Sequence, residues 1–97
     1  MSVASGHSFV QLSNESATSG PYTLVKGWYA LTVTATWGGG SVELDVVAAD
    51  GSTKIAVRDA FTADTFDTGH LPDGQYYFTI ATATGVYLTL SRVADGR

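Results

Sequence analysis

Apolar and polar residues alternate along most of this 97-residue chain, most regularly in the run GWYALTVTAT that begins at Gly27. Every second residue from Tyr29 to Trp37 is apolar, while threonine occupies most of the positions between them. A period of two puts one set of side chains against a core and the other set in solvent, as in a half-buried antiparallel strand. We therefore predict a strand over residues 28–37 whose inner face begins at Tyr29.

The same alternation recurs between turn residues along the chain, and no segment has the 3.6-residue period of a helix. We predict eight short strands, at residues 8–13, 21–25, 28–37, 41–49, 53–60, 63–68, 75–82 and 86–93. Turn signals every eight to twelve residues or so are typical of β-sandwiches and jelly rolls. The predicted fold is all-β: one antiparallel β-sandwich or jelly-roll-like domain over residues 1–97, with 1–7 as an N-terminal arm and 94–97 as a loose tail.

The pattern Leu-x-x-Gly-x-Tyr-x-x-Thr-(Val/Ile) occurs twice, first at Leu24 and again at Leu71. Each copy is followed by a glycine-containing link and a second alternating segment, so we predict that the repeated unit is a β-hairpin. Asp50-Gly51 is a hairpin turn signal, and so is the Leu-Pro-Asp-Gly sequence of residues 71–74.

The charge pattern limits the classes of partner. The net charge is −4, and the five basic residues are scattered rather than clustered, whereas a nucleic-acid-binding protein needs a positive surface against the phosphates. No apolar run approaches the roughly 18–20 residues of a membrane helix. The start of the chain, MSVASGHSFV, has neither the basic nor the apolar region of a signal peptide. We expect no nucleic-acid partner, no membrane segment and no export.

The residues that carry chemistry do not form a motif. Cysteine is absent, which excludes disulfides, thiolate nucleophiles and cysteine-ligated zinc. The two histidines, His7 and His70, have no adjacent catalytic partner in sequence. Residues 38–40 are three glycines without the Lys-Ser/Thr of a phosphate-binding loop, so we interpret them as a flexible hairpin tip. We expect no catalytic residue, metal or cofactor.

Two sets of residues remain as candidate sites. Calcium binding is an alternative to ordinary turn formation for four aspartates in a turn-rich region, Asp59, Asp64, Asp67 and Asp73. Three aromatic residues alternate onto the side opposite the predicted core, where they fit a protein interface, a platform for sugar rings or plain packing. These candidate interface residues are Trp28, Tyr77 and Tyr87, joined by Val3 and His7 of the N-terminal arm.

Residues 20–93 resemble small virion-associated proteins encoded by tailed bacteriophages. The resemblance rests on Gly27-Trp28-Tyr29, the Thr-Trp-Gly-Gly-Gly turn of residues 36–40, Val42-Glu43-Leu44, Asp50-Gly51-Ser52 and the Leu-Pro-Asp-Gly-Gln-Tyr sequence of residues 71–76.

That resemblance implies a non-enzymatic head decoration (cement) protein, made in the host cytoplasm and placed on the outer capsid surface. Its partner would be the major capsid protein, and a homo-oligomer, with a trimer favoured, would sit at local symmetry axes. It brings no catalytic or metal-binding residues. The alternatives are a structural module of a tail, a fibre or the head–tail joint, and a small carbohydrate-binding β-sandwich.

Overall fold

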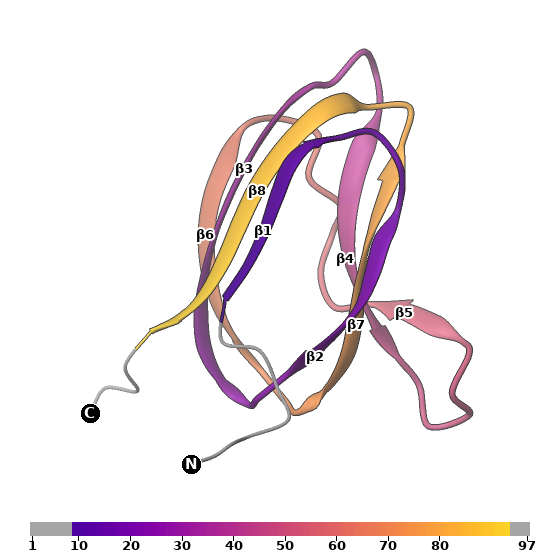
Figure 1. Cartoon of the computed structure of the whole chain (residues 1–97), viewed down its shortest axis with the longest axis vertical. Coiled ribbons are helices and arrows are strands. Elements are labelled where there is room, and N and C mark those ends of the chain that lie inside the picture. The colour runs from indigo at the N-terminus through magenta and orange to yellow at the C-terminus, as the bar shows by residue number, and fades with distance from the viewer. Residues whose placement is uncertain (1–8, 94–97) are drawn as a thin grey trace.

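The computed structural model describes residues 9–93, which fold into eight β-strands (Figure 1). The strands are β1 (Phe9–Glu15), β2 (Ser19–Leu24), β3 (Gly27–Thr36), β4 (Ser41–Val47), β5 (Lys54–Ala56), β6 (Thr65–Leu71), β7 (Gly74–Ala81) and β8 (Thr84–Val93). All eight overlap the predicted segments, although β5 is cut to three residues and β6 lies later than expected. Residues 9–93 contain no helix that could cross a membrane. The predicted arm and tail, residues 1–7 and 94–97, lie outside the described residues.

The strands form two four-stranded antiparallel sheets packed against each other, in the orders β1-β8-β3-β6 and β2-β7-β4-β5 (Figure 1). β1 pairs with β8, β2 with β7, β3 with β6, and β4 with β5. Such nested pairing is that of one long hairpin rolled up across two sheets, which is the jelly-roll arrangement. The predicted all-β sandwich is therefore confirmed.

The core lies between the sheets and follows the predicted alternation. Tyr29, Leu31 and Val33 of β3 are buried, while the trailing Trp37 is only partly so. The buried apolar residues are Val10, Leu12, Leu24, Tyr29, Leu31, Val33, Val42, Leu44, Phe61, Leu71, Tyr76, Phe78, Ile80, Ala83, Val86, Leu88 and Leu90. Both sheets contribute, so the apolar area that this core removes from water stabilises the two layers together.

The predicted hairpins within each repeat are wrong. β3 and β4 belong to different sheets, and so do β7 and β8. The turn of residues 71–74 likewise crosses from one sheet to the other, and of the predicted hairpin turns only that at Asp50-Gly51 joins paired strands, β4 and β5. Alternation indicates which face of a strand is buried but not which strand lies beside it, so it cannot separate a hairpin from a crossing between sheets.

The two repeats instead pair with each other. β3 of the first lies beside β8 of the second, and β4 of the first lies beside β7 of the second. Their opening turns are also neighbours, because Leu24 is opposite Gly74 and Gly27 is opposite Leu71. These turns, β2–β3 and β6–β7, lie together at the bottom of Figure 1.

Each repeat tyrosine closes its own turn. The hydroxyl of Tyr29 donates to the carbonyl oxygen of Val25, and that of Tyr76 donates to the carbonyl oxygen of Pro72 at 2.6 Å. Both acceptors lie four residues upstream, as in the tyrosine corner of immunoglobulin-type sandwiches. Burial raises the pKa of Tyr76 to about 12. The repeated Leu-x-x-Gly-x-Tyr pattern therefore specifies a corner between sheets.

The three glycines of residues 38–40 are not simply a flexible tip. Gly40 lies against the turn between β7 and β8, where an added Cβ would come within 2.2 Å of the carbonyl oxygen of Ala81 and 2.4 Å of the amide nitrogen of Ala83. No real Cβ approaches backbone atoms so closely. Gly40 therefore lets the link between β3 and β4 pack directly against the link between β7 and β8.

Candidate docking surface

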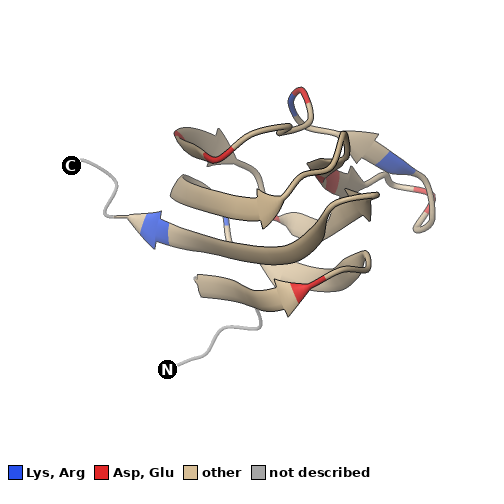
Figure 2. Ribbon diagram, turned by 90° about the horizontal axis from the view of Figure 1, so that it is seen from above, with Lys and Arg blue, Asp and Glu red and all other residues tan. Residues whose placement is uncertain are grey.

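The outward side of the β1-β8-β3-β6 sheet is almost free of charge. We call it the aromatic face, and its residues are Phe9, Gln11, Trp28, Ala30, Thr32, Thr34, Phe66, Thr68, His70, Tyr87, Thr89, Ser91 and Val93. None of them is acidic or basic apart from His70. Figure 2 shows that β3 carries no charged residue and that β1 and β8 carry them only at their ends.

Strand register arranges this face in four rows. Trp28 lies between Val93 and His70, Ala30 between Ser91 and Thr68, Thr32 between Thr89 and Phe66, and Thr34 beside Tyr87. Phe9 and Gln11 extend the second and third rows across β1. The rows are a regular consequence of antiparallel pairing, because residues directly opposite each other point to the same side.

Contacts within the rows hold the surface side chains. The rings of Trp28 and His70 meet edge to face with centroids 5.5 Å apart and an interplanar angle of 77°. The hydroxyls of Thr32 and Thr89 are hydrogen-bonded at 2.6 Å. The residues of the face are thus held by hydrogen-bonded strands and not by loops.

Most of the exposed large apolar side chains of residues 9–93 lie on this face. Of the six described, five belong to the aromatic face: Phe9, Trp28, Phe66, Tyr87 and Val93, with exposed fractions of 50%, 45%, 68%, 53% and 41%. The sixth, Ile55, lies on β5 of the other sheet. Single exposed apolar residues need no explanation, whereas five on one almost uncharged sheet face make that face a candidate binding surface.

The outward side of the other sheet is different in character. It carries Glu43, Asp45 and Lys54, and the Lys54 ammonium lies 4.4 Å from the ring centroid of Tyr77. Tyr77 is partly buried, and an added Cβ at Gly20 would lie 2.8 Å from its ring. Tyr77 is therefore a packed residue under a cation.

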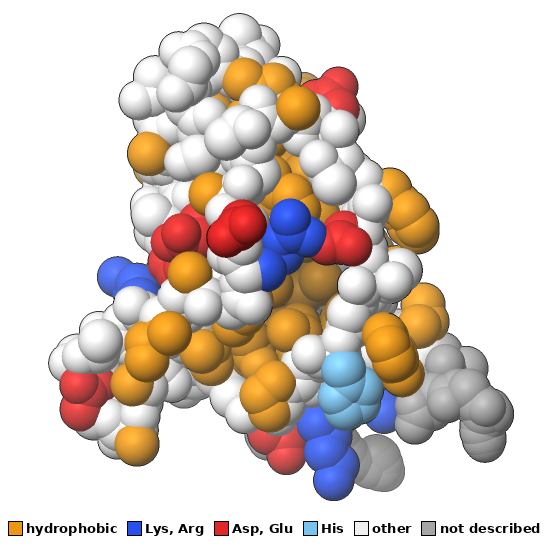
Figure 3. Space-filling model, turned by 180° about the vertical axis from the view of Figure 1, so that it is seen from behind, with side chains coloured by type: hydrophobic (Ala, Val, Ile, Leu, Met, Phe, Trp, Pro, Cys, Tyr) orange, Lys and Arg blue, Asp and Glu red, His pale blue; other side chains and the backbone are white. Residues whose placement is uncertain are grey.

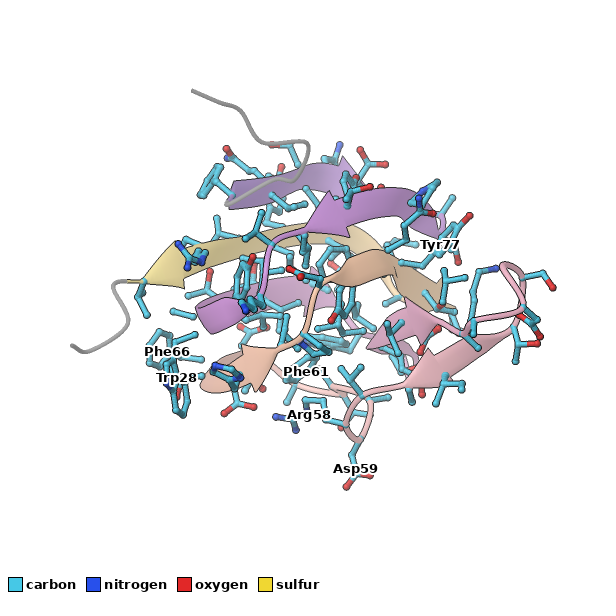
Figure 4. The ribbon with its side chains drawn as sticks, turned by 90° about the horizontal axis from the view of Figure 1, so that it is seen from below. Trp28, Arg58, Asp59, Phe61, Phe66 and Tyr77 are labelled. Carbon is cyan, nitrogen blue, oxygen red and sulfur yellow. The ribbon has the colours of Figure 1, made fainter. Side chains whose placement is uncertain are left out.

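The structure separates the residues that the sequence singled out. Trp28 and Tyr87 share the aromatic face, at rows six positions apart along β3, or roughly 20 Å. Tyr77 points to the opposite side of the sandwich, and Figure 4 shows it far from Trp28 and Phe66. Val3 and His7 lie outside the described residues.

Sequence reasoning missed Phe66 and Phe9. Counting back by twos from the buried Leu71 puts residues 69, 67 and 65 inward, which leaves Phe66 outward. The same count from Leu12 and Val10 places Phe9 outward. The signal was therefore present in each strand, but only the sheet order shows that these residues join Trp28 and Tyr87.

The four aspartates considered for calcium do not converge. Asp67 pairs with Arg58, the Asp64 carboxylate accepts from the Trp37 indole, and the Asp73 carboxylate accepts from the amide of Lys26. Among residues 9–93, no three histidine or acidic side chains are close enough to hold a metal ion. His70 contacts the Trp28 ring, an arrangement that suits surface packing.

One pair of carboxyl groups is unusual in its setting. Asp45 is 4% exposed, and its Oδ2 accepts a hydrogen bond from the Thr79 hydroxyl at 2.6 Å. Its Oδ1 has no hydrogen-bond partner within the described part of the chain. Asp45 raises the pKa of the neighbouring Glu43, chiefly because a protonated Glu43 can hydrogen-bond to it, with partial burial and the Asp45 charge adding to the effect. A proton on Glu43 would supply the donor that Asp45 Oδ1 needs.

Neither a protein-family model, nor a curated protein, nor a solved structure matches this chain.

Proposed function

We propose that this chain is a non-enzymatic structural protein of a phage particle, which binds the outside of the assembled head as a decoration protein. The observation that carries the proposal is the aromatic face, an almost uncharged sheet surface that carries five of the six exposed large apolar side chains of residues 9–93. The jelly-roll strand order, which is used in viral capsid domains and in lectins, agrees with it. The net charge of −4 suits a position away from packaged DNA.

The size of the face sets how strongly one copy binds. Four strands about 4.8 Å apart and four rows about 6.7 Å apart give a footprint on the order of 500 Å². A standard interface buries about 800 Å² on each partner, so one face alone makes a modest contact with the major capsid protein. Several linked copies bind far more tightly than one, because each later contact is intramolecular. This argument favours a homo-oligomer, and we propose a trimer.

Stabilisation of the shell follows from mass action. A protein that binds only the assembled lattice lowers the free energy of that lattice by its binding free energy. Because the aromatic face carries no acidic or basic residue apart from His70, binding through it should depend weakly on salt. A contact made by surface charges would weaken sharply as salt increases.

The proposal is tested with a face variant and a matched control. The face variant, Trp28→Ser with Phe66→Ser, removes two exposed aromatic side chains of the aromatic face. The control, Ile55→Ser, removes the one exposed large apolar side chain of residues 9–93 that lies outside this face. Co-sedimentation with heads of the parent phage that lack this protein measures binding. Aromatic anchors at an interface contribute about 2 kcal/mol or more each, so each loss should weaken binding roughly 30-fold.

The control should bind as the wild type does, with all variants retaining their far-ultraviolet circular dichroism and a light-scattering mass near three times 10.1 kDa. Undiminished binding by the double variant, or equal loss in the control, would contradict docking through this face. Binding to tails but not to heads would move the protein to the tail, fibre or joint alternative.

Sugar binding is a second candidate because Trp28 is half exposed on a sheet of a fold that lectins also use. A glycan panel monitored by tryptophan fluorescence distinguishes the two. A saturable response that the Trp28→Ser variant loses would favour the carbohydrate-binding function.

A further inference from the structure

The inner side of β6 is unusually small and polar for a strand of this sandwich. Its inward positions are Thr65, Asp67 and Gly69, before the buried Leu71 at the end of the strand. A Cβ added at Gly69 would meet no atom within 4 Å, so open space lies on its inner side. Gly69 is not among the glycines with positive φ, so its backbone does not require glycine. An interior strand glycine of this kind often marks a place where a ligand approaches closely.

That space is part of a cavity of about 180 Å³ between β6 and the segment of residues 57–61. The lining residues are Tyr29, Leu31, Leu44, Val57, Arg58, Phe61, Asp67, Thr68, Gly69, His70, Leu71 and Leu90. Leu31 and Leu90 come from one sheet and Leu44 from the other, so the inner wall of the cavity is formed by core residues of both sheets. Figure 3 shows apolar side chains visible in a hollow of this side of the molecule, beneath charged ones.

Charged groups lie at the mouth and not at depth. Arg58 pairs with Asp67, and the two side chains are 40% and 39% exposed. The Arg58 guanidinium also lies 4.3 Å from the ring centroid of Phe61, and its Nε donates to the carbonyl oxygen of Asp59 at 2.9 Å. Figure 4 shows Arg58 and Asp59 at the outer side of this segment, with Phe61 between the sheets. A ligand inserted past Arg58 therefore meets an apolar wall.

We propose that this cavity binds one small apolar ring, of about the size of benzene. Ligands fit apolar cavities when their volumes match, and an engineered cavity of about 150 Å³ lined by leucine, isoleucine and phenylalanine takes up benzene. The cavity here is slightly larger and is likewise lined mostly by leucine, valine and aromatic side chains. The ring enters beside the Arg58–Asp67 pair, which leaves any polar substituent at the exposed mouth.

The ring has two sources that share this chemistry. It is either a free small molecule or the side chain of a phenylalanine presented by another protein. Thr68 and His70 belong both to the cavity lining and to the aromatic face, but the apolar wall of the cavity lies on the inner side of β6. The inference rests on that wall and does not depend on the proposed docking function.

The test uses the full chain, two probes and a pair of matched variants. Benzene represents the free ring, and N-acetyl-L-phenylalanine amide represents the same ring attached to a peptide backbone. Gly69→Leu fills the cavity from the inner side of β6. Thr34→Leu adds the same side chain on the outward side of β3, away from the cavity. The readouts are the thermal midpoint and methyl NMR shifts of Leu31, Leu44 and Leu90.

Benzene at about ten times its dissociation constant should raise the midpoint of the wild type and of Thr34→Leu by roughly 5–10 °C. It should move the three leucine methyl signals and leave Gly69→Leu unchanged. A response to N-acetyl-L-phenylalanine amide as well identifies a protein side chain as the source, whereas a response to benzene alone identifies a free molecule. The proposal is overturned if the leucine methyl signals of the wild type do not shift at saturating benzene, a result that does not depend on whether Gly69→Leu folds. It is also overturned if Gly69→Leu responds to benzene as the wild type does.

Discussion

The hydroxyls of Tyr29 and Tyr76 offer the sharpest test of how the repeated sequence specifies the fold. Replacing either tyrosine by phenylalanine removes one hydroxyl and leaves the buried ring in place. Each change deletes the hydrogen bond from the hydroxyl to a backbone carbonyl, that of Val25 or of Pro72. The two variants therefore measure the same interaction at the two copies of the corner.

The expected loss follows from the environment of these hydroxyls. A protein hydrogen bond contributes about 1 kcal/mol net, and a carbonyl left without a partner in a partly buried site adds to that cost. For a domain of this size, 1 kcal/mol corresponds to roughly 4–8 °C in the thermal midpoint. We expect a loss of about 1–2 kcal/mol for Tyr29→Phe and for Tyr76→Phe, each measured by urea unfolding.

Alkaline titration gives a second, independent signature. The folded-state pKa of Tyr76 is raised from 10.0 to about 12 because the phenol is buried. A raised pKa means that the protonated phenol stabilises the folded state below pH 10, and that this contribution is lost as the pH rises towards 12. The Tyr76→Phe variant should lack this part of the alkaline loss.

The control is Tyr87→Phe, since Tyr87 is 53% exposed on the aromatic face. A surface change of this kind usually alters stability by less than about 0.5 kcal/mol. If Tyr87→Phe costs as much as the corner variants, or if only one of the two corners matters, the interpretation of the repeat as two equivalent corners is refuted.

Two further predictions concern the ends and the outer side of the β2-β7-β4-β5 sheet. Glu43→Gln should raise stability at pH 7 by about 1 kcal/mol, because an amide N–H can donate to the unpartnered Asp45 Oδ1 at any pH. The pKa of Glu43 is raised from 4.5, so the protonated acid stabilises the fold at low pH and that contribution is lost as the pH rises. The stability advantage of Glu43→Gln over the wild type, measured by urea unfolding, should therefore grow from pH 4 to pH 7. An advantage that does not change with pH would contradict this prediction. Gly40→Ala should lower the free energy of unfolding by about 3 kcal/mol or more, because the added Cβ meets the backbone of Ala81 and Ala83. The control Gly39→Ala has no atom within 4 Å of its added Cβ and should cost about 1 kcal/mol, from strain at its positive φ. Equal losses in thermal unfolding would argue against close packing between the β3–β4 link and the β7–β8 link.

Strand positions and buried faces could be predicted because they depend on short-range pattern. Tyr29, Leu31 and Val33 alternate with polar residues, and burial follows that alternation directly. β6 was less predictable: it has few apolar residues until Leu71, so its ends were set by pairing with β3 and not by its own pattern. Pairing between strands distant in sequence leaves no mark in either strand alone.

The candidate site depends on just this long-range order. Phe9, Trp28, Phe66 and Tyr87 stand on four different strands, and they share a surface only because the jelly roll interleaves β1, β8, β3 and β6. Had the predicted hairpins formed, β3 would lie beside β4, and Trp28 would belong to the same surface as the charged Glu43 and Asp45.

Because β3 and β4, and likewise β7 and β8, lie in different sheets instead of forming hairpins, most exposed large apolar residues lie on one outer face and the charged residues Glu43, Asp45 and Lys54 on the other. In the first repeat, the hydrogen bond of Tyr29 and the close packing of Gly40 stabilise the links that cross between the sheets. The repeat therefore acts through topology: it places most of the exposed aromatic side chains on one outer face and Glu43, Asp45 and Lys54 on the other.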